Sequence, residues 1–377
     1  MDWQNSKNDS IAIRRQLLNE IRRSEGISRV ALAQVSGMTR PTVSSIVTEF
    51  INAGLVRELG KGRSTGGKRP IMLALQDEEP CVAGIAIGED YVIRAVSCDL
   101  SGRIRTKEVM EYSNTFDSIR DTSVALVRNL QKTGAGLKGI GVAVSGLVDA
   151  SSGEVRSSRT LDICHRGFGA AVSQETGLPV YLENRAASAA LAESLYGAGR
   201  HYRDMVYLSS GRGIGLGIVV NGKLFRGSHG AAGELGDVPF KLDPKVPSLE
   251  RRLQPETLTC RASELLREKL DYPAFLSKLK SGNPVLEELL FEVAETLARA
   301  LRGAIALLDP EALVLGGQLL DLGPVFFDRF SELMASPEDE ERFGRTLAVC
   351  KSELGEFGGA LGGATVLLER IFHLQPV

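Results

Sequence analysis

The chain of 377 residues lacks any run approaching the roughly 20 apolar residues of a transmembrane helix, which argues against a membrane span. Its first residues, MDWQNSKNDS, lack the basic start and apolar centre of a secretory signal peptide. It has only five cysteines, scattered and without a Cys-x-x-Cys pair, which indicates buried reduced thiols and no disulfide framework. Together these absences predict a cytoplasmic protein.

Net charge is also scarce, at −2 for the whole chain, but the charges are unevenly spread. Residues 1–75 hold 12 lysines and arginines against 6 acidic residues, whereas the remainder holds 33 against 41. The N-terminal part therefore suits an anionic partner, and the acidic remainder does not. The length allows two or three domains.

Three short helices are predicted in the N-terminal part. Apolar residues at helical spacing predict a first helix over residues 11–21, and Ser28 is placed to cap a second. Thr39 is placed to cap a third helix that ends at Gly54, with Pro41 in its first turn, where a missing N–H costs nothing. The second and third helices are close enough in sequence to form a helix-turn-helix.

A glycine-rich basic loop follows these helices and favours a wing over a plain three-helix bundle. The loop, GKGRSTGGKRP, lies between predicted strands at 55–59 and 71–75. Hydroxyls and an arginine early in the third helix suit phosphate oxygens and base edges, and the basic loop suits a minor groove or phosphates. The sequence thus predicts a double-stranded DNA operator as partner. The predicted DNA-binding residues are Ser28, Thr39, Arg40, Thr42, Ser44, Ser45, Lys61, Arg63, Lys68 and Arg69.

The same loop contains a near-match to a nucleotide-binding P-loop. Gly62, Gly67 and Lys68 fit the pattern G-x-x-x-x-G-K, but Arg69 stands where a serine or threonine would bind Mg²⁺. Pro70 and a β-rich run follow, where a P-loop would open a helix. A nucleotide site in this loop is therefore disfavoured.

Strands and helices alternate over residues 80–377, which predicts an α/β body. Each half of the body begins with antiparallel strands, and two such halves resemble the actin-like ATPase architecture of sugar kinases and Hsp70. We expect a winged helix-turn-helix domain at 1–78, a first actin-like lobe at 79–182 plus about 358–377, and a second at 183–357 that carries the dimerisation surface.

Four glycine-rich segments make this resemblance specific, at residues 141–155, 178–193, 206–237 and 312–319. In this order they resemble the repressor–ORF–kinase (ROK) family, which includes sugar kinases and sugar-responsive repressors. The block HGAAGELG at 229–236 is the most distinctive part. The resemblance covers nearly the whole body, and a preceding winged helix is what the repressor branch adds. It implies a homodimeric or homotetrameric regulator, most simply a repressor of carbohydrate genes, with a sugar-type effector between its lobes.

By the same resemblance, most devices of a family sugar kinase are missing. Ala86 replaces the aspartate of the phosphate loop, and Glu89 and Asp90 add negative charge where phosphates would lie. Arg185 occupies the position of the catalytic base, and a guanidinium does not deprotonate in a protein. Asp237 replaces a zinc-binding histidine, and the segment after it has one cysteine. We therefore expect no catalysis, no metal and no cofactor.

Of the sugar-binding residues that the family resemblance implies, some are retained in this sequence and others are replaced. Asn184 and Glu234 match the family motif, whereas Arg159 and Thr160 stand where proline and asparagine are usual. The expected ligand-binding residues are Ser145, Gly146, Arg159, Thr160, Glu183, Asn184, Arg185, Glu234 and Asp237.

Two interpretations of this cleft stay open. In one, the cleft has lost its ligand and the body only dimerises the DNA-binding heads. In the other, Arg159, Arg185 and also Arg166 bind an anionic sugar phosphate or sugar acid, because paired guanidiniums suit such groups. A divergent sugar kinase with an appended DNA-binding domain is the alternative class of protein.

Overall fold

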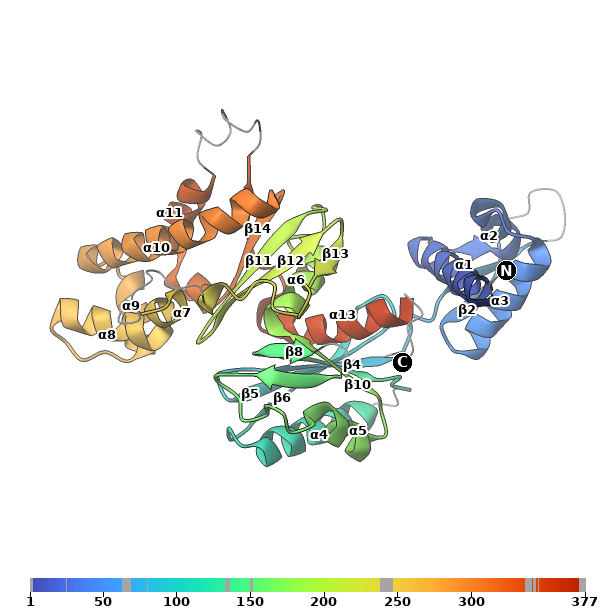
Figure 1. The fold of residues 1–377 in the computed structure, drawn as a ribbon, viewed down its shortest axis with the longest axis horizontal. Coiled ribbons are helices and arrows are strands. Elements are labelled where there is room, and N and C mark those ends of the chain that lie inside the picture. The colour runs from blue at the N-terminus through green and yellow to red at the C-terminus, as the bar shows by residue number, and fades with distance from the viewer. Residues whose placement is uncertain are drawn as a thin grey trace.

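The computed structural model describes residues 3–24, 26–62, 69–79, 81–132, 136–149, 152–237, 247–335, 341, 344 and 346–372. Figure 1 shows a small N-terminal domain, drawn in blue, beside a larger body of two α/β lobes. The last helix, α13 (Gly358–Phe372), is drawn in red and lies in the middle of the body. Within the described ranges, no helix is both long and apolar enough to cross a membrane.

The N-terminal domain is a winged helix, as the sequence predicts. The three strands form an antiparallel sheet in which β3 lies between β1 and β2. Both predicted caps are confirmed: the Ser28 hydroxyl accepts from Ala31 N at 3.1 Å, and the Thr39 hydroxyl accepts from Thr42 N at 3.4 Å. The elements are α1 (Trp3–Arg23), β1 (Ile27–Ser28), α2 (Arg29–Ser36), α3 (Arg40–Asn52), β2 (Val56–Lys61) and β3 (Ile71–Leu75).

The first lobe contains a five-stranded sheet in the order β10-β7-β4-β5-β6. The first three strands along the chain form an antiparallel meander, and β7 and β10 add parallel to β4. A short hairpin, β8–β9, was not predicted from the sequence. The elements are β4 (Val82–Ile87), β5 (Val92–Cys98), β6 (Ile104–Glu111), α4 (Phe116–Lys132), β7 (Ile140–Val144), β8 (Leu147–Asp149), β9 (Glu154–Ser157), α5 (Phe168–Thr176) and β10 (Val180–Asn184).

The second lobe repeats this plan, with the order β13-β12-β11-β14-β15. Again an antiparallel meander comes first, and two parallel strands follow. Helices α7 to α9, helix α11 and strand β15 were not predicted from the sequence. The elements are α6 (Arg185–Tyr196), β11 (Met205–Ser210), β12 (Ile214–Val220), β13 (Lys223–Phe225), η1 (Leu235–Asp237), α7 (Leu249–Leu253), α8 (Pro255–Leu266), α9 (Tyr272–Lys280), α10 (Pro284–Leu308), β14 (Ala312–Gly317), η2 (Gln318–Leu322), α11 (Pro324–Met334), β15 (Ala348–Lys351) and η3 (Gly355–Phe357).

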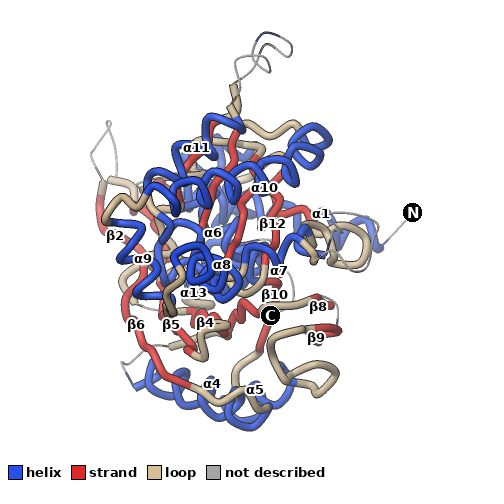
Figure 2. The backbone as a smooth tube through the Cα atoms, turned by 90° about the vertical axis from the view of Figure 1, so that its left-hand side faces the viewer, coloured by secondary structure: helices blue, strands red, loops and turns tan. Residues whose placement is uncertain are grey.

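The two sheets face each other across two helices, α6 and α13. Figures 1 and 2 show α4 and α5 beyond one sheet and α10 and α11 beyond the other, so that α6 and α13 occupy the centre. The central helices touch closely, since a Cβ at Gly362 of α13 would lie 2.5 Å from the Ser188 backbone of α6. The domain limits expected from the sequence stay a prediction, and β10 extends two residues past the expected limit at 182.

The winged helix is attached to the body through α1 and α13. Arg22 Nη1 forms an ion pair with Glu369 Oε1 at 3.2 Å, and its guanidinium lies 4.1 Å from the ring centre of Phe372. Asn19 Nδ2 donates to the Phe372 carbonyl at 3.4 Å. Lys138 of the first lobe also donates to the Ala53 carbonyl after α3 at 2.8 Å. These contacts connect the body directly to the winged helix.

The five cysteines are all free, and they differ strongly in exposure. Burial raises the pKa of the Cys81 thiol to about 12 and also raises the pKa of Cys98. Cys260 is exposed. Because the thiolate is the reactive form, we expect an alkylating reagent at neutral pH to modify Cys260 at least about 1000-fold faster than Cys81. Peptide mass spectrometry after timed labelling measures this, and rapid labelling of Cys81 in the folded chain would contradict it.

Candidate functional site

The exposed start of α3 carries the side chains predicted to contact DNA. Thr39, Arg40, Thr42, Ser44 and Ser45 are all exposed, whereas the opposite stripe of α3 is buried in the domain core. Lys61 and Arg69 flank the wing and are also exposed. Arg63 and Lys68 lie outside the described residues. A helix with an exposed polar N-terminal turn beside a basic hairpin has the geometry of a DNA-reading head.

Ser28 does not belong to this surface, contrary to the prediction. Its side chain caps α2, and the residue is only 8% exposed. It also pairs with Met72 in the small sheet. The physical reason is that the cap position turns the hydroxyl toward the helix backbone, and burial of the residue keeps it off the exposed face that begins at Thr39.

Two cavities lie between the lobes. The larger has a volume of about 890 Å³ and the smaller about 300 Å³. We call the smaller one the effector cavity. It brings together seven of the nine predicted ligand-binding residues, which are Ser145, Gly146, Arg159, Thr160, Asn184, Arg185 and Glu234.

The other two predicted residues are Glu183 and Asp237. Glu183 is buried outside the lining, where its Oε2 accepts from Arg226 Nε at 2.6 Å and its Oε1 accepts from Asn184 N at 3.0 Å. Glu183 thus holds β10 against the loop after β13. Asp237 lies in η1, and its side chain is outside the described part of the structure.

Asn184 is fixed at the point where β10 becomes α6. Its Oδ1 accepts from Ala186 N at 2.8 Å and Ala187 N at 3.2 Å, which caps the helix. Its Nδ2 donates to the Gly146 carbonyl at 2.9 Å. The side chain therefore ties two walls of the effector cavity together.

Both guanidiniums in the effector cavity face carboxylates. Arg185 Nη2 lies 3.3 Å from Glu89 Oε2, and Arg159 Nη1 lies 3.5 Å from Glu250 Oε1. Arg166, the third arginine considered for an anionic ligand, lines neither cavity and pairs with Asp162 at 3.0 Å. The positive charge expected to attract an anion is thus matched by acidic side chains.

The Ser145 hydroxyl belongs to a residue in the wall of the effector cavity. Ser145 Oγ is buried and makes no hydrogen bond to any residue that the structure describes. Such a group costs free energy unless something bonds to it. A ligand hydroxyl in the cavity suits this oxygen as donor or acceptor.

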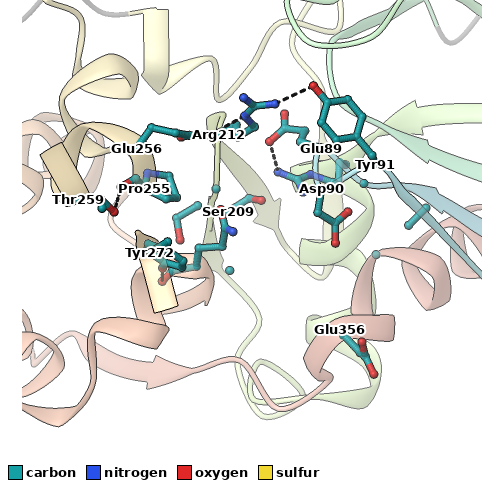
Figure 3. A pocket seen from close by; sticks show the side chains of 18 of the residues that line it. Glu89, Asp90, Tyr91, Ser209, Arg212, Pro255, Glu256, Thr259, Tyr272 and Glu356 are labelled. Atoms are coloured by element: carbon teal, nitrogen blue, oxygen red, sulfur yellow. Dashed lines mark hydrogen bonds and ion pairs between the residues drawn. The ribbon is translucent and has the colours of Figure 1, made fainter. Parts of the chain in front are cut away.

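The larger cavity is crossed by a polar bridge between the lobes, shown in Figure 3. Arg212 Nη1 donates to the Tyr91 hydroxyl at 3.2 Å, and Arg212 Nε pairs with Glu256 Oε1 at 3.0 Å. On the first-lobe side, Asp90 pairs with Arg94 at 2.9 Å. This lining is rich in charge of both signs.

Metal-binding side chains do not gather in the described ranges. No group of three or more histidine, cysteine or acidic residues among them has the arrangement of a metal site. The expectation that the protein holds no zinc stays a prediction.

Among the cavity residues that were missed as site residues are two carboxylates, Glu89 and Glu250. From the sequence, Glu89 is expected only to repel nucleotide phosphates. It comes directly after Gly88 at the end of a buried strand, where a polar side chain often reaches a site, and this signal could have found it. Glu250 lies on α7, which was not predicted.

Comparison with known proteins extends these observations over the whole chain. The profile of the ROK family matches residues 82–370, and a profile described as winged helix-turn-helix DNA-binding matches residues 12–57. The xylose repressor of Bacillus spizizenii is 26% identical over 370 residues, which cover 95% of each chain. The N-acetylglucosamine repressor of Escherichia coli O157:H7 is 25% identical over 372 residues, covering 91% of this chain and 89% of that protein.

Solved structures of ROK family proteins have a similar fold. A ROK family transcriptional regulator, described as a homologue of the Escherichia coli MLC protein, matches 97% of each chain with a TM-score of 0.82 and 18% identity, so it supports the fold. A ROK family glucokinase from Streptomyces griseus, solved with glucose and AMPPNP, covers 76% of this chain and 98% of its own with a TM-score of 0.66 and 25% identity. The chain therefore belongs to the ROK family and carries a winged helix-turn-helix in front of a sugar-kinase-like body.

Proposed function

We propose that the protein is a sequence-specific transcriptional repressor of carbohydrate genes, released from its operator by a sugar bound in the effector cavity. The observation that carries this proposal is the union in one chain of a DNA-reading head and an inter-lobe cavity. The two are joined through packed helices: Arg185 begins α6, α6 packs on α13, and α13 holds α1.

The proposed effector is an uncharged sugar. The cavity of about 300 Å³ lies at the small end of ligand pockets, which suits a single sugar ring. Ser145 offers a hydroxyl that bonds to none of the described residues, and Glu234 is a further polar group in the lining. The anionic alternative is weaker, because Arg159 and Arg185 already face carboxylates.

A sugar that binds between lobes changes the regulator only if it prefers one lobe arrangement to another. Cleft residues come from both lobes, so ligand contacts favour one closure angle. A movement of α13 relative to the two sheets would be transmitted to the winged helix through the ion pair between Arg22 and Glu369. We infer that this is how sugar occupancy lowers DNA affinity.

We also propose that the protein has no kinase activity. Arg185 begins α6. By the resemblance to family sugar kinases it occupies the position of their catalytic base, and a guanidinium cannot accept the proton of a sugar hydroxyl. Measurement of ATP consumption with a panel of monosaccharides distinguishes the rival, a divergent kinase, because that rival requires sugar-dependent turnover.

On this proposal the DNA is contacted by the start of α3 and by the wing, through Thr39, Arg40, Thr42, Ser44, Ser45, Lys61, Arg63, Lys68 and Arg69. A homodimer or homotetramer places pairs of heads on a pseudo-palindromic operator in the cytoplasm. Light scattering measures the oligomeric state.

The effector proposal predicts the behaviour of Ser145→Ala. In a mobility-shift assay on DNA recovered by genome-wide mapping of the bound sites, we expect a neutral monosaccharide to release the wild-type protein. Ser145→Ala should need about 5- to 10-fold more of that sugar, because one hydrogen bond is lost. Its binding to DNA without sugar should be unchanged.

Ser331→Ala is the matched control. Ser331 Oγ is likewise buried without a partner among the described residues, but it lies on α11, away from both cavities. Equal effects of the two variants on sugar response would remove Ser145 from the site. If no sugar changes DNA binding by the wild-type protein, the alternative of an effector-independent DNA-binding dimer is favoured.

A further inference from the structure

Glu89 lies between the two cavities and receives hydrogen bonds from three directions. Its Oε2 accepts from Gly213 N at 3.0 Å and from Arg185 Nη2 at 3.3 Å, and its Oε1 accepts from Thr160 Oγ1 at 3.4 Å. The donors come from the β11–β12 turn, the start of α6 and the loop after β9. The Glu89 side chain is only 6% exposed. Donors from both lobes therefore converge on one buried carboxylate.

A backbone N–H, a hydroxyl and a guanidinium that converge on one point form a cradle for an anion. The next backbone amide after Gly213 also binds a carboxylate: Ile214 N donates to Glu250 Oε2 at 3.1 Å. Two successive amides of the glycine turn and both guanidiniums of the effector cavity are thus bonded to carboxylates of the chain itself. The donors that could bind an external anion already bind the Glu89 carboxylate of the chain itself.

Glu89 is also part of the wall that the two cavities share. It lines both of them, together with Arg185 and Ser209. A phosphate or carboxylate that entered the effector cavity would approach Glu89 in a poorly solvated place, where like charges repel strongly. It would also find the Arg185 guanidinium already engaged. A neutral polyol meets neither obstacle.

We propose that Glu89 determines the specificity of the effector cavity: its carboxylate fills the anion cradle made by Gly213, Arg185 and Thr160, so that the cavity accepts uncharged sugars and rejects phosphorylated or acidic ones. This inference rests on the proposed function and adds the residue that selects the class of effector. Removing the Glu89 carboxylate leaves an empty anion site, which inorganic phosphate is small enough to enter.

The test measures binding of inorganic phosphate and of glucose 6-phosphate to the full chain by isothermal titration calorimetry. We expect Glu89→Ala to bind phosphate at least about 10-fold more tightly than the wild-type protein, because the freed guanidinium and amide donate to the new anion. The double variant Glu89→Ala/Arg185→Ala should lose that gain. Glu89→Gln keeps the shape of the side chain without its charge, and it should bind glucose 6-phosphate more tightly than the wild-type protein does.

Glu356→Gln is the matched control. Glu356 also lines the larger cavity and pairs with Arg94 at 3.4 Å, but it makes no contact with Arg185 within the described structure. Its removal changes the net charge by the same amount, so it should leave phosphate binding at the wild-type level. A gain in Glu356→Gln equal to that of Glu89→Ala would reduce the effect to overall charge and overturn the proposal.

Two other results would overturn it: a folded Glu89→Ala that binds phosphate no more tightly than the wild-type protein, or a gain that survives loss of Arg185. If Glu89→Ala does not fold, Glu89→Gln decides, and a folded Glu89→Gln without any gain overturns the proposal. These measurements use no DNA. Failure of the proposed function would appear separately, as a wild-type protein whose DNA binding no sugar changes.

Discussion

Replacing Arg40 with alanine will weaken operator binding by about 10- to 100-fold and leave the fold and the self-association of the protein unchanged. Arg40 is the first residue of α3 and is exposed. It makes no ion pair with the residues that the structure describes. A positive charge at a helix N-terminus is unfavourable for the helix dipole, so its removal should not destabilise the domain. An arginine that does not serve stability at this place is well suited to bind DNA.

Arg14→Ala is the control for overall charge. Arg14 also belongs to the winged helix, but it pairs with Glu49 at 2.9 Å near the other end of α3. Fluorescence anisotropy with operator DNA at several salt concentrations separates the two variants. Equal losses would mean that Arg40 acts only through net charge, and a parallel loss of self-association would mean that it is structural.

Substitutions in the wing can be tested in the same assay. Lys61→Ala and Arg69→Ala should each weaken binding to all sequences similarly, because phosphate contacts carry no sequence information. Each lost phosphate contact should reduce the slope of log affinity against log salt by about 0.9. A wing substitution that changed sequence preference without changing that slope would assign base contacts to the wing.

Replacing Gly141 with alanine will destabilise the body by at least about 3 kcal/mol. Gly141 lies on β7, directly beneath α13. A Cβ there would lie 2.5 Å from the carbonyl carbon of Gly363 and closer still to its oxygen. Both Gly363 atoms belong to the backbone and cannot rotate away, so α13 must move away from the sheet. Because α13 also holds α1, loosening it should free the winged helix as well.

Gly303→Ala tests the same chemical change without the steric clash. Gly303 is an exposed residue inside α10, and a Cβ there meets nothing within 4 Å. Alanine should therefore stabilise the protein by about 0.5–1 kcal/mol, since glycine is costly in a helix. Urea denaturation of both variants gives the two free energies of unfolding. If Gly141→Ala has the same free energy of unfolding as the wild-type protein, α13 does not pack closely on β7, and the prediction is wrong.

Much of the fold follows from local patterns in the sequence. The helical spacing before Ile21, the caps at Ser28 and Thr39 and the proline at 41 act over a few residues, so they specify the winged helix directly. The alternation of strands and helices likewise predicts two α/β halves. The hairpin β8–β9, the helices α7 to α9 and α11 and the strand β15 were missed, because most of these elements are short, have weak periodic signals and depend on packing for their stability.

The candidate site was predictable to a lesser degree. Motif positions brought seven of the nine expected residues into one cavity. They did not reveal that Ser28 is buried or that Arg159 and Arg185 face carboxylates. These facts depend on which side chains meet, and that is decided by how distant segments pack.

The sequence by itself determined that this chain is a winged helix followed by a sugar-kinase-like body, and the family resemblance predicts that an arginine, Arg185, occupies the position of a catalytic base. Only the tertiary structure decided what that arginine does. Arg185 and Glu89 are separated by 96 residues along the chain, and they meet because the β4–β5 turn of one lobe reaches the start of α6. Periodicity and capping act within a few residues, whereas the pairing of buried charges is fixed by the packing of lobe against lobe.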